Sequence, residues 1–482
     1  MRLLTLIKNT IAGSSLPDVF NHVVPSTIYC SHLGTGDGSD IAHPIDFQNC
    51  MNSTRVIAGD TLILLSGIYQ GLFYCNIGGD AANDVIIRSL NCYGADIDGG
   101  IIVNKPYVTL QNIIFSNSDA NRGSWTAPNG SVNRLTGIFL MNHDCNLINN
   151  ITHDNGVGIA FYNAAYNTLC YGNVSYNCGW ADASLGGAQN IYFHGDNNIV
   201  KHNVFAGAFK KTFAAYGNNG SAVNTAITEN VIFSRGTTLI GSGNVATNLI
   251  TFIGNHIIVG GLQCGYTFNQ NGTITVTDNV IWSQIAAGLT FTNFENVTVL
   301  RNKVISGGPP LSGYQGQSIT LTYPLIIGAY NFNNNEYHHL GLITHFVNIE
   351  GVTHYNFAAW QALGHDVAST YDELLPAVNE SHVYLNDYAA TSCRKGMVVI
   401  WNWQELNTVD VDLTALGLVN GHTYTWRNAQ DPLVDVDTFV YTAGVDVTFP
   451  MTGHSVAYPI GFSELLIENQ FPKFGCFIIE EL

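Results

Sequence analysis

Hydrophobic and polar positions follow a repeating phrase through the middle of the chain. Between residues 107 and 308 an asparagine precedes an apolar or β-branched residue, one further residue and, in most copies, another apolar residue. The asparagines that open these copies are Asn112, Asn150, Asn173, Asn203, Asn230, Asn255, Asn279 and Asn302. Their spacings are 38, 23, 30, 27, 25, 24 and 23 residues. A base period of about 24 residues with occasional insertions is typical of one coil of a β-solenoid.

Stacking of such coils explains the pattern physically. Short strands are stable when backbone hydrogen bonds join each coil to its neighbours about 4.8 Å away. Because side chains alternate between the two faces of a strand, the inward Ile, Val, Leu and Phe form a continuous core. Asparagine suits the sharp turn, since it tolerates left-handed backbone and its amide can bond the next asparagine in a ladder. Leucine-rich repeats and propellers have other phrases or periods, so the sequence predicts a parallel β-helix.

Composition narrows the class of partner. Hydrophobic residues make up 46% of the 482 residues, which excludes disorder caused by too little apolar content. Charged residues make up only 11%, and 17 Lys and Arg against 35 Asp and Glu give a net charge of −18. Nucleic acids and anionic membranes attract clustered cations, so neither is expected as a partner. A neutral, hydroxyl-rich partner such as a glycan fits this composition better.

The N-terminus and the cysteines bear on location. The apolar run that follows Met1 is broken at Lys8 without a small-residue cleavage pattern, which makes it a poor secretory signal. No stretch reaches the roughly 18 consecutive apolar residues of a membrane span. The ten cysteines form no CxxC pair. We expect the cysteines to be buried thiols of a protein in a reducing compartment, and disulfides between some of them are the alternative.

Three segments resemble a known family. The phrase from Gly59 to Tyr69, GDTLILLSGIY, resembles the first coil of pectate-lyase-like parallel β-helix proteins. Phe357–Asp366 resembles the amphipathic segment after the last coil, and Val398–Ile479 resembles the β-sandwich appended to many of these proteins. The resemblance implies a right-handed parallel β-helix (solenoid) followed by an antiparallel β-sandwich domain. Its members include polysaccharide lyases, glycoside hydrolases, epimerases and phage tailspikes, so it implies chemistry only weakly.

The domain organisation follows from the repeat and the resemblance. A cap is expected at the open end of the solenoid, because the last coil otherwise exposes an unpaired edge. Alternating apolar residues in the C-terminal region, as in Val409-Asp-Val411, predict antiparallel strands. The predicted parts are an N-terminal extension (1–27), the parallel β-helix (28–308), a cap and linker (309–370) and the β-sandwich (371–482).

Candidate binding residues come from strand alternation. Two insertions, at residues 118–135 and 179–189, flank strands near residues 137–141, 158–162 and 190–194. If Ile138, Leu140, Ile159, Phe161, Ile191 and Phe193 face inward, their neighbours form an outward aromatic row. The predicted substrate-binding residues are Phe139, Tyr162, Tyr192 and Tyr216, joined by Arg235, with Met141 and His194 on the same row. Inserted loops or a neighbouring subunit covering this row is the alternative.

Two kinds of catalysis have candidate residues. A polysaccharide lyase needs a base, plus a cation or a metal for the uronate carboxylate, and His194 with Lys211 could supply them; Ca²⁺ is the cofactor to consider for a lyase. A hydrolase needs two carboxyl groups, and Asp182 with Asp196 could supply them.

A purely structural role remains an alternative for each candidate residue. Lys210-Lys211 and Asp196-Asn197-Asn198 also fit solvated turns, and His143-Asp144 and His153-Asp154 fit turns better than metal ligands. No metal site is predicted, and no complete lyase or hydrolase signature is present, so enzymatic activity is left undecided.

The resulting hypothesis is a glycan-recognising β-helix, namely a bacteriophage tailspike or receptor-binding protein with polysaccharide depolymerase activity left open. The absent export signal fits a virion component released by cell lysis, and the N-terminal segment would dock on the virion. The resemblance to tailspikes implies a homotrimer. A secreted bacterial polysaccharide lyase or glycoside hydrolase and a non-catalytic virion structural protein are the alternatives.

Overall fold

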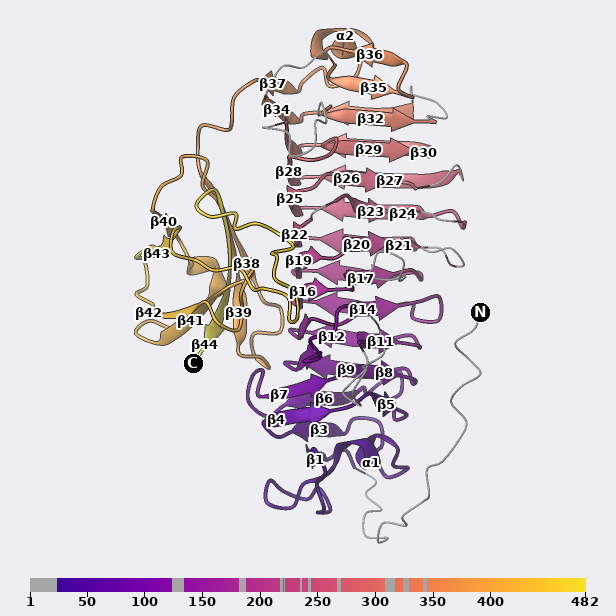
Figure 1. Cartoon of the computed structure of the whole chain (residues 1–482), viewed down its shortest axis with the longest axis vertical. Helices are drawn as coiled ribbons and strands as arrows, with labels where there is room; N and C mark the ends of the chain where they lie inside the picture. Colours follow the sequence, from indigo (N-terminus) through magenta and orange to yellow (C-terminus); the bar gives the residue numbers. More distant parts are fainter. Residues whose placement is uncertain are drawn as a thin grey trace.

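The computed structural model of the chain describes residues 24–123, 134–181, 188–216, 220, 222–234, 236–241, 244–266, 270–307, 317–323, 329–340 and 345–482. Three long sheets wind around one axis, and successive strands pass from one sheet to the next (Figure 1). Every strand pair within these sheets is parallel except the last pair of the third sheet. The predicted parallel β-helix is therefore confirmed.

The strands of the three sheets are short, as the period predicts. Sheet A contains β1 (Thr27–Ser31), β2 (Ile45–Asp46), β3 (Thr61–Leu64), β6 (Val85–Ser89), β9 (Val108–Gln111), β12 (Asn146–Ile148), β15 (Leu169–Tyr171), β18 (Ile199–Lys201), β21 (Val223–Thr228), β24 (Asn248–Ile253), β27 (Asn271–Thr277), β30 (Phe294–Leu300) and β33 (Tyr330–Asn333). Sheet B contains β4 (Gly67–Gln70), β7 (Ala95–Asp98), β10 (Ile114–Ser116), β13 (Ile151–His153), β16 (Val174–Cys178), β19 (Val204–Ala208), β22 (Val231–Phe233), β25 (His256–Val259), β28 (Val280–Ser283), β31 (Lys303–Gly307), β34 (Glu336–Leu340) and β37 (Thr370–Asp372). Sheet C contains β5 (Phe73–Cys75), β8 (Ile101–Val103), β11 (Thr136–Leu140), β14 (Val157–Phe161), β17 (Gln189–Phe193), β20 (Lys211–Ala215), β23 (Thr238–Ile240), β26 (Leu262–Cys264), β29 (Leu289–Thr292), β32 (Ile319–Thr322), β35 (Val347–Ile349) and β36 (Thr353–Tyr355).

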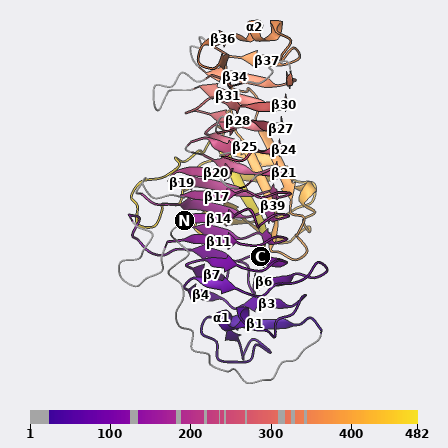
Figure 2. The same cartoon turned by 90° about the vertical axis from the view of Figure 1, so that its right-hand side faces the viewer.

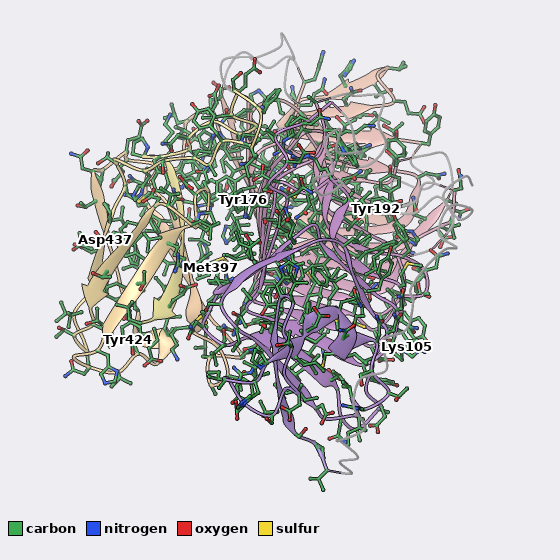
Figure 3. The ribbon with its side chains drawn as sticks, turned by 60° about the horizontal axis from the view of Figure 1, so that its bottom comes forward. Lys105, Tyr176, Tyr192, Met397, Tyr424 and Asp437 are labelled. Carbon is green, nitrogen blue, oxygen red and sulfur yellow. A yellow bond between two sulfur atoms is a disulfide. The ribbon has the colours of Figure 1, made fainter. Side chains whose placement is uncertain are left out.

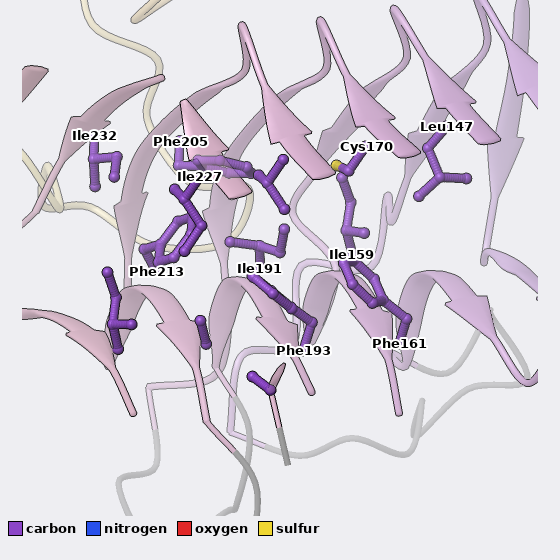
Figure 4. Packing of buried hydrophobic residues seen from close by; sticks show 14 of the residues in the cluster. Leu147, Ile159, Phe161, Cys170, Ile191, Phe193, Phe205, Phe213, Ile227 and Ile232 are labelled. Carbon is purple, nitrogen blue, oxygen red and sulfur yellow. The ribbon is translucent and has the colours of Figure 1, made fainter. Parts of the chain in front are cut away.

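The inward positions form a hydrophobic core along the axis (Figure 4). In sheet C the pairs Ile159 with Ile191 and Phe161 with Phe193 lie in register on successive coils, and all four side chains are fully buried. The alternation predicted for these strands is confirmed.

An asparagine ladder runs through the turn between sheets A and B. The backbone N–H and the Nδ2 of each ladder residue both donate to Oδ1 of the next, at 2.7–3.1 Å. Each amide is almost completely buried, so these bonds satisfy groups that would otherwise be costly. The ladder residues are Asn150, Asn173, Asn203, Asn230, Asn255, Asn279, Asn302 and Asn335.

Two details of the predicted ladder are wrong. Asn112 is not a rung: its backbone is left-handed (φ 58°), and its Oδ1 accepts a hydrogen bond from Ser392 Oγ at 2.9 Å. The left-handed residue is the one before each ladder asparagine, for example Asn149 (φ 55°) before Asn150 and Gly172 (φ 66°) before the next rung. The turn residue and the ladder residue are thus separate positions, and the turn points the following amide inward.

The solenoid continues past its predicted end at residue 308. β31 pairs with β34, and β34 pairs with β37, both in parallel. Asn335 extends the ladder by one coil, 33 residues after the previous rung. This copy departs from the phrase, because Asn335 is followed by Glu336-Tyr337-His338. The helix α2 (Phe357–Ala362) then covers the last coil with Trp360, which is fully buried and donates from Nε1 to Asp366 at 2.9 Å. At the other end α1 (Phe47–Met51) packs Phe47 against the first coil.

The C-terminal domain is a small antiparallel sandwich. A five-stranded sheet contains β38 (Glu380–Leu385), β39 (Arg394–Trp401), β44 (Phe474–Glu481), β41 (Thr423–Asn428) and β42 (Val436–Val440). The second sheet pairs β40 (Thr408–Val411) with β43 (Val447–Pro450), and the short 3₁₀ helix η2 (Thr414–Leu416) follows β40. One face of the larger sheet forms a core with the smaller sheet, where Val398 and Phe477 meet Phe449.

The other face of the larger sheet packs on the outside of sheet B. Met397 and Trp401 from β39 join Tyr176 and Phe233 of the solenoid in one buried cluster. Figure 3 places Tyr176 and Met397 between the two domains and Tyr192 on the far side of the solenoid. The sandwich therefore leaves sheet C uncovered (Figure 2).

Covalent and ionic links fix this junction. A disulfide joins Cys92 to Cys393, 301 residues apart, and the other eight cysteines are free and buried. The eight free cysteines are the buried thiols that were expected, and Cys92–Cys393 is one of the disulfides that the sequence left possible; docking of the sandwich brings these two distant cysteines together. Deeper in the junction the Arg122 guanidinium pairs with Asp154, whose Oδ1 also accepts from the Ile460 N–H at 2.8 Å. No helix in the described part of the chain is long and apolar enough to cross a membrane.

Candidate functional site

A row of aromatic rings crosses the outer face of sheet C. It consists of Phe139, Tyr162, Tyr192, Tyr216 and Tyr266, and is called the aromatic strip. Successive ring centroids are 5.0, 5.6, 5.7 and 5.4 Å apart. Tyr162 is 39% exposed and Tyr266 50% exposed, whereas the other three rings are partly exposed. Five rings in successive contact, with one coil skipped between Tyr216 and Tyr266, thus form one continuous, solvent-accessible surface.

The backbone explains how these rings fit. Phe139 and Tyr192 point outward from the strands β11 and β17. The register places Ala160 of β14 between these two residues and Ala214 of β20 on the other side of Tyr192. These alanines leave room for the large rings and are buried. On the alanine coils the aromatic residue instead comes directly after the strand, as with Tyr162 after β14. The strip therefore zigzags between two positions on alternate coils.

The rings pack edge to face and not as a flat pavement. The interplanar angle is 78° between Phe139 and Tyr162, 77° between Tyr162 and Tyr192, and 89° between Tyr192 and Tyr216. Tyr162 is nearly parallel to His194 of the next coil, at 5.0 Å and 15°. Rings that stack from one coil to the next have their planes roughly perpendicular to the solenoid axis, and this holds for Tyr162 and His194. The plane of the Tyr192 ring is nearly perpendicular to that of Tyr162, so it lies roughly parallel to the axis.

His194 lies at the centre of this row with unused hydrogen-bonding capacity. It is 7% exposed, and its Nδ1 has no hydrogen-bond partner among the described residues. A Cβ placed on Gly220 would lie 2.5 Å from this nitrogen and 1.8 Å from Asn163 Oδ1, so only glycine fits there. Burial lowers the pKa of His194 to about 4, and the imidazole is therefore neutral at pH 7.

Lys211 reaches the other end of the strip. Its ammonium lies 5.0 Å from the centroid of the Tyr266 ring, which is cation–π geometry. Burial and the neighbouring Lys210 lower its pKa. Lys211 pairs with Gln189 at the start of the sheet C strands, whereas His194 follows their end, so their backbones are about 16 Å apart at roughly 3.3 Å per residue. The structure places the two groups at separate points, and their joint catalytic role stays a prediction.

The other predicted site residues divide into two groups. Asp182 and Arg235 lie outside the described residues. Asp196 is a turn residue at a coil junction, where its Oδ1 accepts from the Val223 N–H at 3.1 Å. Its catalytic role stays a prediction.

The two His-Asp pairs are also turns. Asp144 and Asp154 have left-handed backbone (φ 52° and 59°), and each accepts from the Nδ1 of the preceding histidine. Within the described residues no group of three or more His, Cys, Asp and Glu is placed to hold a metal ion.

Sequence reasoning missed Tyr266. It follows β26 by two residues and is separated from Tyr216 by a coil without an aromatic ring at either position, so alternation within a strand gave no signal. Asn163 was also missed, because its place beside His194 depends on a contact with Gly220 that spans 57 residues.

Comparison with known proteins identifies fold neighbours. No family model and no curated protein matches the chain. Similar solved structures include the pectate lyase Pel9A, with 16% identity, 67% of this chain and 76% of that chain covered, and a TM-score of 0.43. The tailspike protein gp49 from Acinetobacter baumannii bacteriophage Fri1, a capsular polysaccharide depolymerase, has 11% identity, covers 87% and 79%, and has a TM-score of 0.39. The Dettilon tailspike protein gp208 has 11% identity, covers 94% and 93%, and has a TM-score of 0.37. These similarities concern the fold alone: the chain is a parallel β-helix with a C-terminal sandwich, and pectate lyase and tailspike β-helices are among its structural neighbours.

Proposed function

We propose that the protein binds a polysaccharide along the outer face of sheet C. The observation that carries this proposal is the aromatic strip, five contiguous rings on a face that the C-terminal domain leaves uncovered. Exposed aromatic rows on a soluble protein mark an interaction surface. Sugar rings offer C–H faces to aromatic rings and hydroxyls to their polar edges, which suits a strip of tyrosines.

Ring orientation sets the direction of the bound glycan. Tyr192 and Phe139 carry the rings that run along the solenoid axis, and they lie two coils apart, roughly 10 Å at about 4.8 Å per coil. A glycan chain parallel to the axis can lie against both rings. Tyr162 lies between these two rings and Tyr216 lies beyond Tyr192. Both turn a ring edge toward the glycan, and these edges separate neighbouring sugar units.

The working environment of the protein is part of the proposal. A disulfide between distant segments suits an oxidising compartment, which favours an extracellular or virion protein. We assign it the role of a tailspike-like receptor-binding protein, with the N-terminal extension (residues 1–27) as the docking segment and a trimer as its assembly. A secreted polysaccharide lyase or glycoside hydrolase is the alternative.

His194 is the residue on which catalysis would depend. It is neutral at pH 7, and its Nδ1 is buried beside Gly220 without a hydrogen-bond partner among the described residues. Proton exchange with a sugar bound on Tyr192 therefore requires Gly220 to move and expose this nitrogen. Cleavage of the glycan is therefore assigned to His194 and glycan affinity to Tyr192.

A panel of capsular and uronate polysaccharides tests both assignments. Affinity electrophoresis measures binding, reducing ends measure any cleavage, and absorbance at 235 nm distinguishes a lyase product. We expect Tyr192→Ala to weaken binding about 10-fold, His194→Ala to keep binding and abolish cleavage, and Tyr458→Ala, an exposed tyrosine of the sandwich, to change neither. Glycan binding that is unaffected by Tyr192→Ala contradicts the site, and cleavage that survives His194→Ala contradicts the division of labour.

A further inference from the structure

A groove lies on a different face of the solenoid from the aromatic strip. It has a volume of about 820 Å³ and runs between the outer face of sheet A and the segment that joins β38 to β39 of the sandwich. The strands β6, β9 and β12 form its floor, and residues 388–393 form its wall. The disulfide between Cys92 and Cys393 ties floor to wall. Docking of the C-terminal domain thus creates a fixed groove that neither domain has alone.

One end of the floor offers a fixed hydrogen-bond acceptor. Asp84 Oδ2 accepts from Thr109 Oγ1 at 2.6 Å and from Asn146 Nδ2 at 2.7 Å. These two bonds orient the carboxylate, and no described residue donates to Oδ1. An ionised carboxylate accepts about four hydrogen bonds, so Oδ1 is free for ligand hydroxyls. The partly exposed Tyr388 also lines the groove, and burial, Asp387 and Asp84, in that order, raise its pKa.

The other end offers an unpaired cation. The Arg88 side chain lines the groove and makes no hydrogen bond or ion pair within the described part of the chain. The remaining cation of the lining, Lys395, is paired with Glu481 at 2.6 Å. A planar guanidinium binds a carboxylate through two parallel hydrogen bonds. Arg88 is therefore the position in the groove that selects a ligand carboxylate.

The distance between these two groups sets the ligand size. Asp84 and Arg88 lie on one face of the β6 segment, four residues apart, so their Cα atoms are separated by about 13 Å at roughly 3.3 Å per residue. An oligosaccharide spans this length, whereas a monosaccharide does not. Apolar side chains such as Ile86 and Ala389 lie between them and can contact the C–H faces of sugar rings.

Other ligand classes fit less well. A nucleic acid or polyphosphate brings several phosphates, but the groove offers one unpaired cation beside the carboxylates of Asp84 and Glu481. An extended peptide needs a free strand edge, but β6 and β9 already pair with strands on both sides.

We infer that this groove is a second saccharide site, which binds an acidic oligosaccharide with its carboxylate on Arg88 and its hydroxyls on Asp84. The site shares its ligand class with the proposed function but stands on separate residues. This second contact retains an acidic glycan while the aromatic strip binds another part of the same glycan.

Calorimetric titration of the full chain carrying Tyr192→Ala tests this site with the strip weakened. The probes are tetrasaccharides of galacturonate, mannuronate and glucuronate-containing repeats, each with its carboxyl-reduced counterpart. We expect at least one acidic probe to bind and its reduced form to bind about 10- to 100-fold more weakly. Adding Arg88→Ala should cause the same loss, and Arg88→Lys should restore part of it. Lys105→Ala, which removes an exposed cation outside the groove, should leave the affinity unchanged.

Four outcomes overturn the inference. They are no binding of any acidic probe, equal binding of the acidic and reduced forms, an affinity indifferent to Arg88→Ala, and an equal loss in Lys105→Ala. The proposed function fails on a different result, namely unchanged polysaccharide binding when Tyr192→Ala is made alone, so the two failures are distinguishable.

Discussion

Removal of one amide from the middle of the asparagine ladder should destabilise the solenoid severely. Asn255 is fully buried and makes five side-chain hydrogen bonds. Its Oδ1 accepts from the N–H and Nδ2 of Asn230 at 3.0 and 2.9 Å. Its Nδ2 donates to Ile227 O at 2.9 Å, Ile253 O at 3.2 Å and Asn279 Oδ1 at 3.1 Å. Asn255→Ala removes all five and leaves the buried N–H of Asn230 without this acceptor.

The magnitude follows from these bonds. At a net value of about 1 kcal/mol each, five bonds amount to about 5 kcal/mol. The Asn279 oxygen keeps its second donor, the N–H of residue 255, so part of the loss is recovered. We therefore expect a decrease of about 3–5 kcal/mol in the free energy of unfolding, at the severe end of single substitutions.

Equilibrium unfolding in urea, followed by tryptophan fluorescence, measures this difference. The matched control is Asn296→Ala, at an exposed asparagine in β30 of the same solenoid. It should change the free energy by less than about 0.5 kcal/mol. A loss below about 1 kcal/mol for Asn255→Ala, or equal losses in both variants, would refute the ladder as a stabilising feature.

Three further predictions concern the domain junction and the strip. Burial and the neighbouring His382 hold the pKa of His256 well below its usual range, so the unfolded chain binds a proton more readily. The contribution of His256 to the free energy of unfolding is fully present above about pH 6.5 and falls by up to about 1.4 kcal/mol per pH unit below it. Urea midpoints measured from pH 5 to 8 should show this slope, and an unchanged slope in His256→Gln contradicts the prediction. Replacing Cys92 and Cys393 by serine should lower the stability by about 2–5 kcal/mol, measured as a lower melting temperature; alkylation of both cysteines in the unreduced protein would contradict the bridge. Lys211→Ala should weaken binding of acidic polysaccharides more than of their carboxyl-reduced forms in affinity electrophoresis, and equal weakening of both contradicts its role.

The coil repeat was readable from sequence because it depends on local spacing. Each ladder residue such as Asn230 must recur once per coil, whereas the copy at Asn335 was missed because Glu336-Tyr337-His338 departs from the apolar phrase. Docking of the sandwich was harder to predict, because it joins surfaces that are far apart in the chain. The sequence signal for this docking was the uninterrupted apolar run Val231-Ile232-Phe233 of β22. A strand that is buried on both faces does not alternate between apolar and polar residues.

The candidate site was predictable in part for the same reason. Tyr192 follows from strict alternation within β17, whereas Tyr266 lies after its strand. The unpaired Nδ1 of His194 depends on how Gly220 packs against it, and no local pattern encodes that contact. The pairing of Cys92 with Cys393 likewise depends on domain docking.

A crystal structure of the protein with a bound oligosaccharide from a polysaccharide that it binds tests the central claim most directly. We predict sugar density on the outer face of sheet C, parallel to the solenoid axis, with one pyranose ring against Tyr192 and another against Phe139. Sugar found only elsewhere, whether in the sheet A groove or between subunits, or a partner subunit seated on the aromatic strip in place of glycan, would contradict it.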